Sequence, residues 1–173
     1  MRILVFLQGT TIMHKNAVDK TREEIVQQVK EQGESVRDFK SYIPVGNAST
    51  KLKKWVEQGA QISYLTALTE DKRARGDEIV GKVGLKVDRE ILNRYGFPKG
   101  EVYHRQRGEN YQDVVERMDP LPDIIIEDDC ESIGGEKEMT CPHLRPELKT
   151  KIKSIVVKEF GGIDYLSDQL SQL

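Results

Sequence analysis

The chain has 173 residues, the usual size of a single domain, and carries 27 Lys plus Arg against 29 Asp plus Glu. The resulting net charge of -2 argues against nucleic acid as a partner and against electrostatic attraction to anionic lipid. No apolar run approaches the roughly 20 residues of a membrane-spanning helix, so we expect a soluble, cytoplasmic protein with no membrane partner.

Apolar stretches alternate with amphipathic ones along the chain, which is the pattern of repeated strand and helix units. Apolar runs without alternation are typical of strands buried on both faces of a parallel sheet. Five strands are predicted: Ile3 to Leu7, Gln61 to Leu65, Glu101 to His104, Ile124 to Ile126 and Ile152 to Val157. We therefore predict an α/β fold, a three-layer α/β/α sandwich around a central parallel sheet of about five strands.

The segments between these strands predict helices. They are Asp19 to Gln32, a helix capped by Ser49 or Thr50 that runs up to Gly59, Asp77 to Tyr95, and Asn110 to Met118. Gly81 and Gly84 weaken the third segment, so we predict two helices or a broken helix there. We find no linker that separates domains. The prediction is a single domain over residues 1–173, with a small helical insertion around 11–43.

Ligands of an open parallel sheet bind beyond the carboxyl ends of the strands, so the residues after each strand are candidates for a site. A Gly turn offers backbone N–H groups to an anion, a Thr offers a hydroxyl, and an Arg offers a planar cation. Three acids at the mouth of a buried strand repel one another unless a cation such as Mg²⁺ neutralises them. The residues in question are Gln8, Gly9 and Thr10, then Thr66, then Arg105 and Arg107, and then Glu127, Asp128 and Asp129.

Each of these groups also has an ordinary structural explanation. Acids at a strand end are commonly solvated or cap the next helix, and a Thr that ends a strand is commonly part of a turn. His14 is predicted to be a surface loop residue and not a base. Cys130, Cys141 and His143 match no common zinc-site spacing, and both thiols are predicted to be free.

The order of the four groups resembles the haloacid dehalogenase (HAD) superfamily. The motifs of that family are an Asp-x-Asp-Gly-Thr loop, a Thr or Ser, a Lys or Arg, and an acidic pair at successive strand ends. The matching segments are Ile3 to Thr10, Ile62 to Thr66, and Ile124 to Asp129, with Arg107 as the third-motif cation and Arg105 as its rival. The resemblance implies a HAD-like, Rossmann-like fold with a minimal cap. It implies phosphate ligands at Gly9, Thr10, Thr66 and Arg107, and Mg²⁺ ligands at Asp128, Asp129 and Glu127.

One departure from the family pattern affects the chemistry. Aligned on the Gly-Thr pair of the loop, the nucleophilic aspartate falls on Phe6 and the general acid/base aspartate falls on Gln8. Phe cannot attack phosphorus, and Gln cannot transfer a proton near neutral pH. No other acid lies between Met1 and Lys15, so no catalytic residue is certain. If the Phe6 side chain points into the sheet core, away from Asp128, while Gln8 faces Thr66, this alignment of the first loop is wrong.

Three functional hypotheses follow from the resemblance. The first is a HAD-like pseudoenzyme, of uncertain or lost phosphatase activity, that binds a phosphorylated small molecule or a protein partner. The second is a Mg²⁺-dependent phosphohydrolase that activates water without an aspartyl-phosphate intermediate. The third is a structural or interaction module without catalysis. The sequence determines neither the ligand nor the oligomeric state.

Overall fold

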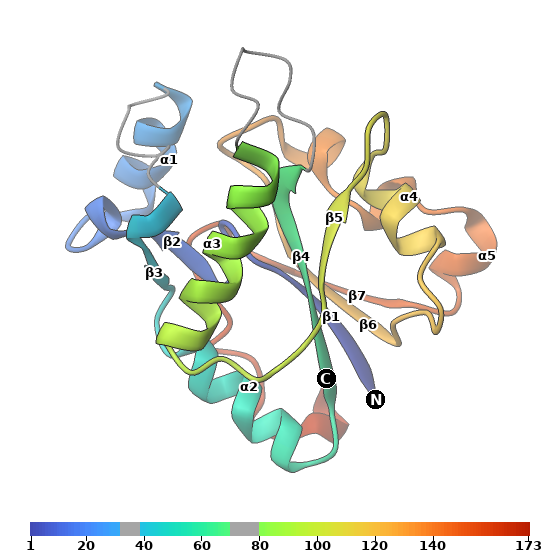
Figure 1. The fold of residues 1–173 in the computed structure, drawn as a ribbon. Helices are drawn as coiled ribbons and strands as arrows, with labels where there is room; N and C mark the ends of the chain where they lie inside the picture. The colour runs from blue at the N-terminus through green and yellow to red at the C-terminus, as the bar shows by residue number, and fades with distance from the viewer. Residues whose placement is uncertain (32–38, 70–79) are drawn as a thin grey trace.

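The central feature of the fold is a five-stranded parallel sheet. The computed structural model describes residues 1–31, 39–69 and 80–173. The strand order is β5-β4-β1-β6-β7 (Figure 1). The strands are β1 Arg2–Phe6, β4 Gln61–Thr69, β5 Val102–Arg105, β6 Ile124–Asp128 and β7 Lys153–Val157. Each overlaps one predicted strand, and helices flank the sheet on both faces, so the predicted three-layer α/β architecture is confirmed.

Strand β1 lies in the middle of the sheet because its residues are apolar on both faces. Leu4 and Val5 are completely buried. Ile3 is opposite Ile62 of β4 on one side and Ile124 of β6 on the other. All five strands run in the same direction, so their carboxyl ends meet at one edge of the sheet. The polar residues that follow the strands are thereby collected at that edge.

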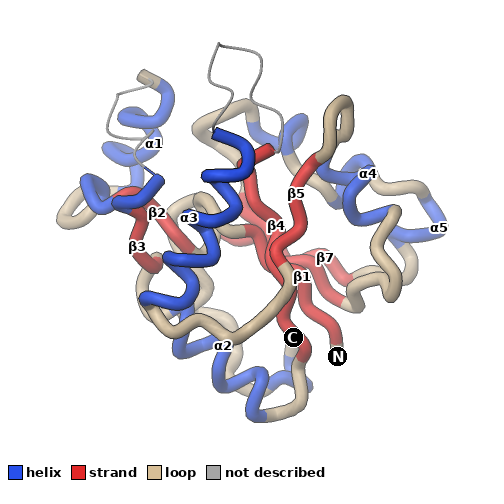
Figure 2. The backbone as a smooth tube through the Cα atoms, in the orientation of Figure 1, coloured by secondary structure: helices blue, strands red, loops and turns tan. Residues whose placement is uncertain are grey.

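Helices cover both faces of the sheet (Figures 1 and 2). The first face carries α2 (Ala48–Glu57) and α3 (Val80–Arg94), and the second carries α4 (Tyr111–Glu116) and α5 (Pro146–Lys149). Trp55 of α2 and Ile91 of α3 belong to the larger core cluster, whereas Val115 of α4 and Leu148 of α5 belong to the smaller one. In the described part of the chain, no helix has the length and apolar composition required to span a membrane.

Two details of the helices differ from the prediction. Helix α2 has Asn47 at its N-cap, so Ser49 and Thr50 lie inside its first turn. Helix α3 is continuous through Gly81 and Gly84, and the predicted break is wrong. A helical Gly costs only about 1 kcal/mol relative to Ala, which the packing of the apolar face of α3 in the larger core cluster offsets. The first residues of the predicted helix, Asp77 to Ile79, lie outside the residues that the structure describes.

The described residues between β1 and α2 form a small lobe beside the carboxyl edge of the sheet (Figure 1). It contains the antiparallel pair β2 (Ile12–His14) and β3 (Tyr42–Pro44), and the helix α1 (Arg22–Lys30). Thr21 and Glu24 form a reciprocal capping box that begins α1. The sequence predicts a helical insertion around 11–43. The described residues of that range add a strand pair to the helix.

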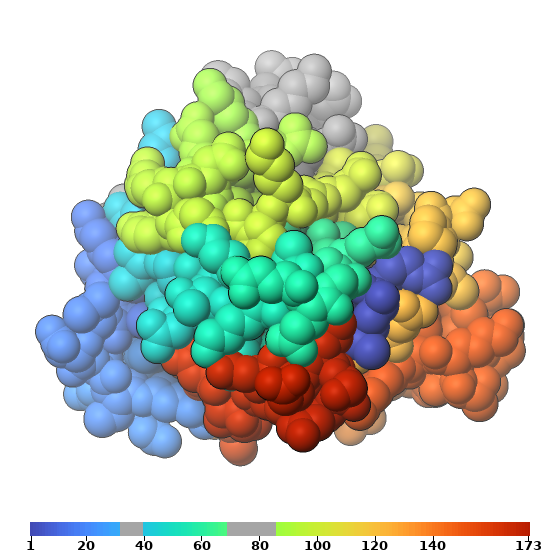
Figure 3. All heavy atoms as spheres, turned by 90° about the horizontal axis from the view of Figure 1, so that it is seen from below, coloured from blue at the N-terminus to red at the C-terminus, as the bar shows by residue number. Residues whose placement is uncertain are grey.

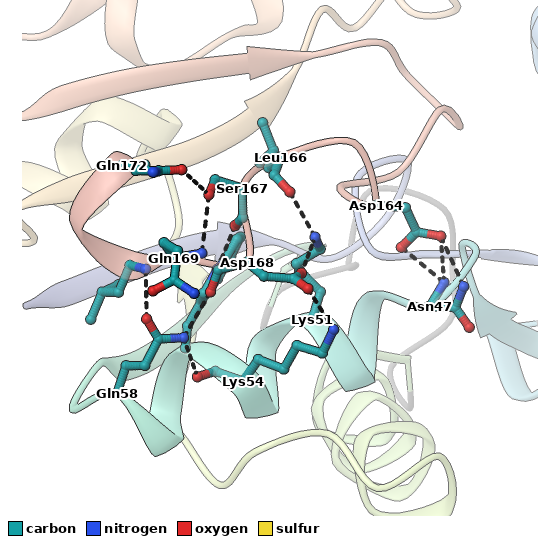
Figure 4. Close-up of polar contacts among 12 residues, drawn as sticks. Asn47, Lys51, Lys54, Gln58, Asp164, Leu166, Ser167, Asp168, Gln169 and Gln172 are labelled. Carbon is teal, nitrogen blue, oxygen red and sulfur yellow. Dashed lines mark hydrogen bonds and ion pairs between the residues drawn. The ribbon is translucent and has the colours of Figure 1, made fainter.

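The C-terminal segment returns to helix α2 and lies beside it on the surface (Figure 3). The Nζ of Lys51 donates to the backbone oxygen of Leu166 at 2.6 Å and to the carboxylate of Asp168 (Figure 4). The indole nitrogen of Trp55 donates to the backbone oxygen of Ser167 at 3.0 Å. Lys51 and Lys54 together lower the pKa of Asp168 to about 2. These contacts fix the chain end against the outer surface of the larger core cluster.

We expect Lys51→Met to lower the free energy of unfolding by about 1–3 kcal/mol, because it removes two charge-assisted hydrogen bonds and keeps the aliphatic packing. Lys54→Met is the matched control, since Lys54 contacts the same carboxylate but its side chain is 47% exposed, against 9% for Lys51. Exposed ion pairs contribute at most about 1 kcal/mol. Urea unfolding of the two variants measures the difference, and equal losses would contradict this account of the C-terminal segment.

Candidate functional site

A pocket of about 150 Å³ opens between the carboxyl edge of the sheet and the small lobe. We call it the edge pocket. Its walls are mostly apolar, and they come from β1, the lobe, the start of α4 and the turn after β7. The apolar and aromatic members include Phe6, Ala17, Ile25, Val29, Tyr42, Tyr111 and Phe160. The acids Asp128 and Glu159 also line it. The edge pocket therefore combines an apolar body with a polar, acidic end.

The turn after β1 is built to approach Asp128. Gly9 has a φ of +86°, and a Cβ at this position would lie 2.9 Å from a carboxylate oxygen of Asp128. Only glycine fits both the backbone conformation and the space. The N–H of Gly9 donates to the backbone oxygen of Ile12 at 3.0 Å. The hydroxyl of Thr10 donates to Asp128 at 2.6 Å. The structure thus brings Gly9, Thr10 and Asp128 together, and both predicted phosphate ligands have protein partners.

Asp128 and Glu159 are buried carboxyl groups held by neighbouring donors. Asp128 also accepts a hydrogen bond from the backbone N–H of Cys130 at 3.0 Å. Glu159 accepts from the backbone N–H and the hydroxyl of Ser132, both at 2.6 Å. Burial raises the pKa of each carboxyl group above its ordinary value, and these hydrogen bonds oppose that shift. The acidic end of the edge pocket is therefore fixed in position.

The carboxylates that gather here differ from the predicted trio. Oxygens of Asp128, Asp129 and Glu159 all lie within 4.8 Å of one another. Glu127 points to the face of β6 opposite Asp128, because successive side chains of a strand alternate between faces, whereas Asp129 lies beyond the end of β6. Its carboxylate accepts from the backbone N–H groups of Thr140 at 2.6 Å and Cys141 at 2.9 Å. The structure therefore groups Glu159, and not Glu127, with the two aspartates.

Asp129 already has cationic neighbours. Arg22 of α1 lies 3.4 Å from its carboxylate, and Lys158 lies 3.8 Å away. Arg22 also pairs with Glu131 at 2.5 Å and donates to the backbone oxygen of Glu159 at 3.0 Å. Arg22 and Lys158 therefore partly neutralise the negative charge of the cluster formed by Asp128, Asp129 and Glu159. They also connect α1, and hence the small lobe, to the sheet edge.

Thr66 belongs to a separate buried network with Gln8 and Asp88. Its hydroxyl donates to Asp88 at 2.6 Å and lies 3.2 Å from the amide oxygen of Gln8. The amide nitrogen of Gln8 donates to the other oxygen of Asp88 at 3.0 Å. Burial raises the pKa of Asp88 to about 6, against these two hydrogen bonds. Thr66 is fully buried, and its hydroxyl serves this network.

Arg105 and Arg107 lie outside the edge pocket, and His14 is less exposed than predicted. Arg107 lies in the exposed turn after β5, and Arg105 is half-buried beside Tyr111; neither lines the edge pocket. His14 is buried at the pocket wall, so its predicted position in a surface loop is wrong. Cys130 is free, as predicted.

Sequence reasoning missed two of the acids that matter here. Glu159 follows β7, and the rule that sites lie after parallel strands could have found it had it been applied to the last strand. Asp88 is in the middle of a helix. It precedes Ile91 and Leu92 by three and four residues, so it shares their apolar face. A charged residue in an apolar stripe is a signal that the sequence does contain.

No family model and no curated protein sequence matches this chain. One solved structure that matches is the universal stress protein from Archaeoglobus fulgidus, with a TM-score of 0.40 and 15% sequence identity over 91% of this chain and 93% of that chain. The predicted membership of the HAD superfamily is corrected here: no comparison supports it, and the first loop is arranged differently. At 15% identity the likeness concerns the fold alone.

The geometry of the first loop gives the physical reason for this correction. Phe6 packs in the smaller core cluster, with its ring 5.1 Å from the ring of Tyr111. The amide oxygen of Gln8 faces Thr66 and accepts from the N–H of Ala67 at 2.8 Å. The two residues are thus explained by packing and by an internal network, and not as relics of a catalytic pair. The predicted HAD-like function, as an active phosphatase or as a pseudoenzyme, depended on membership of that family and is therefore wrong as well.

Proposed function

We propose that the protein binds a small molecule in the edge pocket, and that this ligand has a ring-sized apolar body and a cationic or hydrogen-bond-donating end. The observation that carries the proposal is the pairing of apolar walls with two buried carboxyl groups, Asp128 and Glu159. Ligand sites are commonly apolar clefts with a few placed polar groups at the carboxyl ends of parallel strands. The edge pocket has each of these properties.

The size of the edge pocket limits the apolar part of the ligand. Its volume is about 150 Å³, and an apolar cavity of that size accommodates a benzene-sized ring. Phe6 and Tyr111 form one aromatic wall, and Phe160 lies on the turn after β7. Aromatic walls favour a ring stacked against them or placed edge-on. We therefore expect a monocyclic body and not an extended chain or a fused ring system.

The charge of the edge pocket limits the polar part of the ligand. Asp128 and Glu159 accept hydrogen bonds from the protein but have lone pairs left for a further donor. An ammonium group would gain charge-assisted hydrogen bonds at this end, whereas a phosphate or carboxylate group would be repelled. A small ring amine satisfies both the apolar wall and the acids.

Calorimetric titration with three compounds of one shape tests the proposal: benzylamine, benzyl alcohol and benzoate. We expect benzylamine to bind most tightly, benzyl alcohol more weakly, and benzoate not at all. Asp128→Asn should weaken benzylamine at least tenfold, a loss of about 1.4 kcal/mol. Glu57→Gln is the control, because Glu57 is exposed at the end of α2 that leads into β4, away from the carboxyl edge. Benzoate binding as tightly as benzylamine would refute the proposal.

Amine binding should also depend on pH in a defined direction. Because burial raises the pKa of Asp128 and Glu159, their carboxyl groups take up protons at a higher pH than an exposed acid does. An ammonium ligand prefers the ionised form, so the affinity for benzylamine should fall as the pH is lowered. The same titration in two buffers of different ionisation enthalpy should show proton release on binding. An affinity independent of pH, with no proton released, would argue against carboxylate recognition.

A divalent cation is the second candidate ligand, because Asp128, Asp129 and Glu159 place carboxylate oxygens within 4.8 Å of one another. Such hard oxygen ligands suit Mg²⁺. Arg22 and Lys158 compete for the same charge at Asp129, so we expect Mg²⁺ to bind more weakly than an amine. Mg²⁺ alone, titrated by calorimetry, tests this. Saturable Mg²⁺ binding that Glu159→Gln abolishes, together with competition against benzylamine, would favour the cation.

We also propose the cytoplasm as the site of action. The support comes from the two cysteines, which are both free in the structure. Burial raises the pKa of the Cys141 thiol to about 12 and also raises that of Cys130, so both remain protonated and unreactive near neutral pH. Free, unreactive thiols suit a reducing compartment. Thiol labelling of the native and the urea-unfolded protein tests whether the two thiols are free and unreactive in the folded state. Both thiols are expected to react only after unfolding.

A further inference from the structure

A second cavity, of about 210 Å³, lies on the α4 side of the molecule. We call it the Arg105 cavity. It is bounded by the end of β5, the start of α4 and the short 3-10 helix η5 (Gly135–Glu138). Its charged members are Arg105, Lys137 and Glu138, and Gln112 and His143 add polar groups. Tyr111 lines both cavities, but every charged residue of this one is absent from the edge pocket.

Arg105 is a cationic side chain of this cavity that lacks an anionic partner among the described residues. Its guanidinium carbon lies 4.2 Å from the centroid of the Tyr111 ring, a stacked position that holds the side chain in place. Its Nε is completely covered and has no hydrogen-bond partner. Within residues 1–31, 39–69 and 80–173, no carboxylate pairs with this guanidinium. A half-buried cation without an anionic partner is unfavourable, so an anion held against it would stabilise the structure.

The charge of the Arg105 cavity indicates a monoanion. Two cationic side chains, Arg105 and Lys137, face one anionic side chain, Glu138. A singly charged ligand balances this set, whereas a doubly charged phosphate monoester exceeds it. The planar guanidinium matches the geometry of a carboxylate. The amide of Gln112 lines the same cavity and offers a donor and an acceptor to a neighbouring polar group of the ligand.

We propose that the Arg105 cavity binds a small monocarboxylate that carries a second polar group, such as a 2-hydroxy acid. Arg105 holds the carboxylate, Lys137 adds charge from η5, and Gln112 contacts the second polar group. This site is independent of the edge pocket. It takes an anion where the edge pocket takes a donor or a cation, so each can fail its test without the other.

Calorimetric titration with lactate at fixed ionic strength tests the proposal. We expect saturable binding to the unaltered protein and at least a tenfold loss of affinity in Arg105→Gln. Arg107→Gln is a closely matched control, because Arg107 is an exposed arginine two residues further along the chain and does not line the cavity. It should bind lactate as the unaltered protein does. Absence of lactate binding, or equal losses in the two variants, would overturn the proposal.

Two further measurements test the role of Lys137 and the preference for a carboxylate over a phosphate. Lys137→Gln changes an exposed residue, so it should leave the fold intact and weaken lactate severalfold; no change in affinity would overturn the assigned role of Lys137. Inorganic phosphate is titrated in parallel. Weaker binding of phosphate than of lactate supports a monocarboxylate, and tighter binding of phosphate overturns that assignment.

Discussion

Asp88→Asn is expected to stabilise the protein at neutral and mildly alkaline pH. Burial raises the pKa of Asp88 from 3.8 to about 6, so the folded state holds a proton that the unfolded chain releases at lower pH. The stability that comes from protonated Asp88 is fully present below about pH 4 and is lost as the pH rises through about 6. A change of one unit in pKa corresponds to about 1.4 kcal/mol, so ionised Asp88 lowers the stability above pH 7 by roughly 2–3 kcal/mol.

Asn at this position imitates the neutral acid. Its amide oxygen can accept from Gln8, and its amide nitrogen can donate to the hydroxyl of Thr66, which is free to turn toward Gln8. Urea unfolding of both proteins between about pH 4 and pH 8 measures the effect. The expected gain is about 2–3 kcal/mol at the upper end and near zero at the lower end. Glu90→Gln on the exposed face of α3 is the control. A variant that is less stable than the unaltered protein at every pH would contradict this account.

Phe6→Asp is expected to lower the free energy of unfolding by more than about 4 kcal/mol, or to prevent folding altogether. The substitution removes a buried ring that packs against Tyr111 and places a carboxylate in the smaller core cluster. It also puts that carboxylate close to the acidic end of the edge pocket, where Asp128 repels it. This result would confirm that position 6 is a packing position and not a vacant catalytic one.

Phe6→Leu separates the loss of volume from the burial of charge. We expect it to cost about 1–2 kcal/mol, because a smaller apolar residue leaves a partial cavity but no unpaired polar group. Urea unfolding followed by circular dichroism measures both variants. If Phe6→Asp is as stable as Phe6→Leu, position 6 faces a polar site that accommodates a carboxylate, and our description of the smaller core cluster is wrong.

The sequence predicts the sheet well because strands that are buried on both faces consist almost entirely of apolar residues. Ile3 to Leu7 and Ile124 to Ile126 are continuous apolar runs, and such runs suit the interior of a parallel sheet. The pair β2 and β3 has no comparable signal. Its strands are short, they form a two-stranded sheet apart from the central one, and Pro44 ends the second. Their formation depends on the closure of a loop, which local pattern does not reveal.

The candidate site was only partly predictable for a related reason. The strand-end rule correctly places Gly9, Thr10 and Asp128 at one edge, because parallel topology alone brings them together. It cannot tell which side of a strand each carboxylate takes, and it groups Glu127 with Asp128, although their side chains point to opposite faces. The direction of Gln8 toward Asp88 depends on the packing of α3, which lies far away in the sequence.

A crystal structure of the protein with benzylamine at mildly alkaline pH tests the proposed binding function most directly. We expect the ring inside the edge pocket, against Phe6 and Tyr111, with the ammonium nitrogen within about 3 Å of a carboxylate oxygen of Asp128 or Glu159. A benzylamine molecule bound elsewhere, with the edge pocket empty or filled by the side chains that line it, would contradict the account.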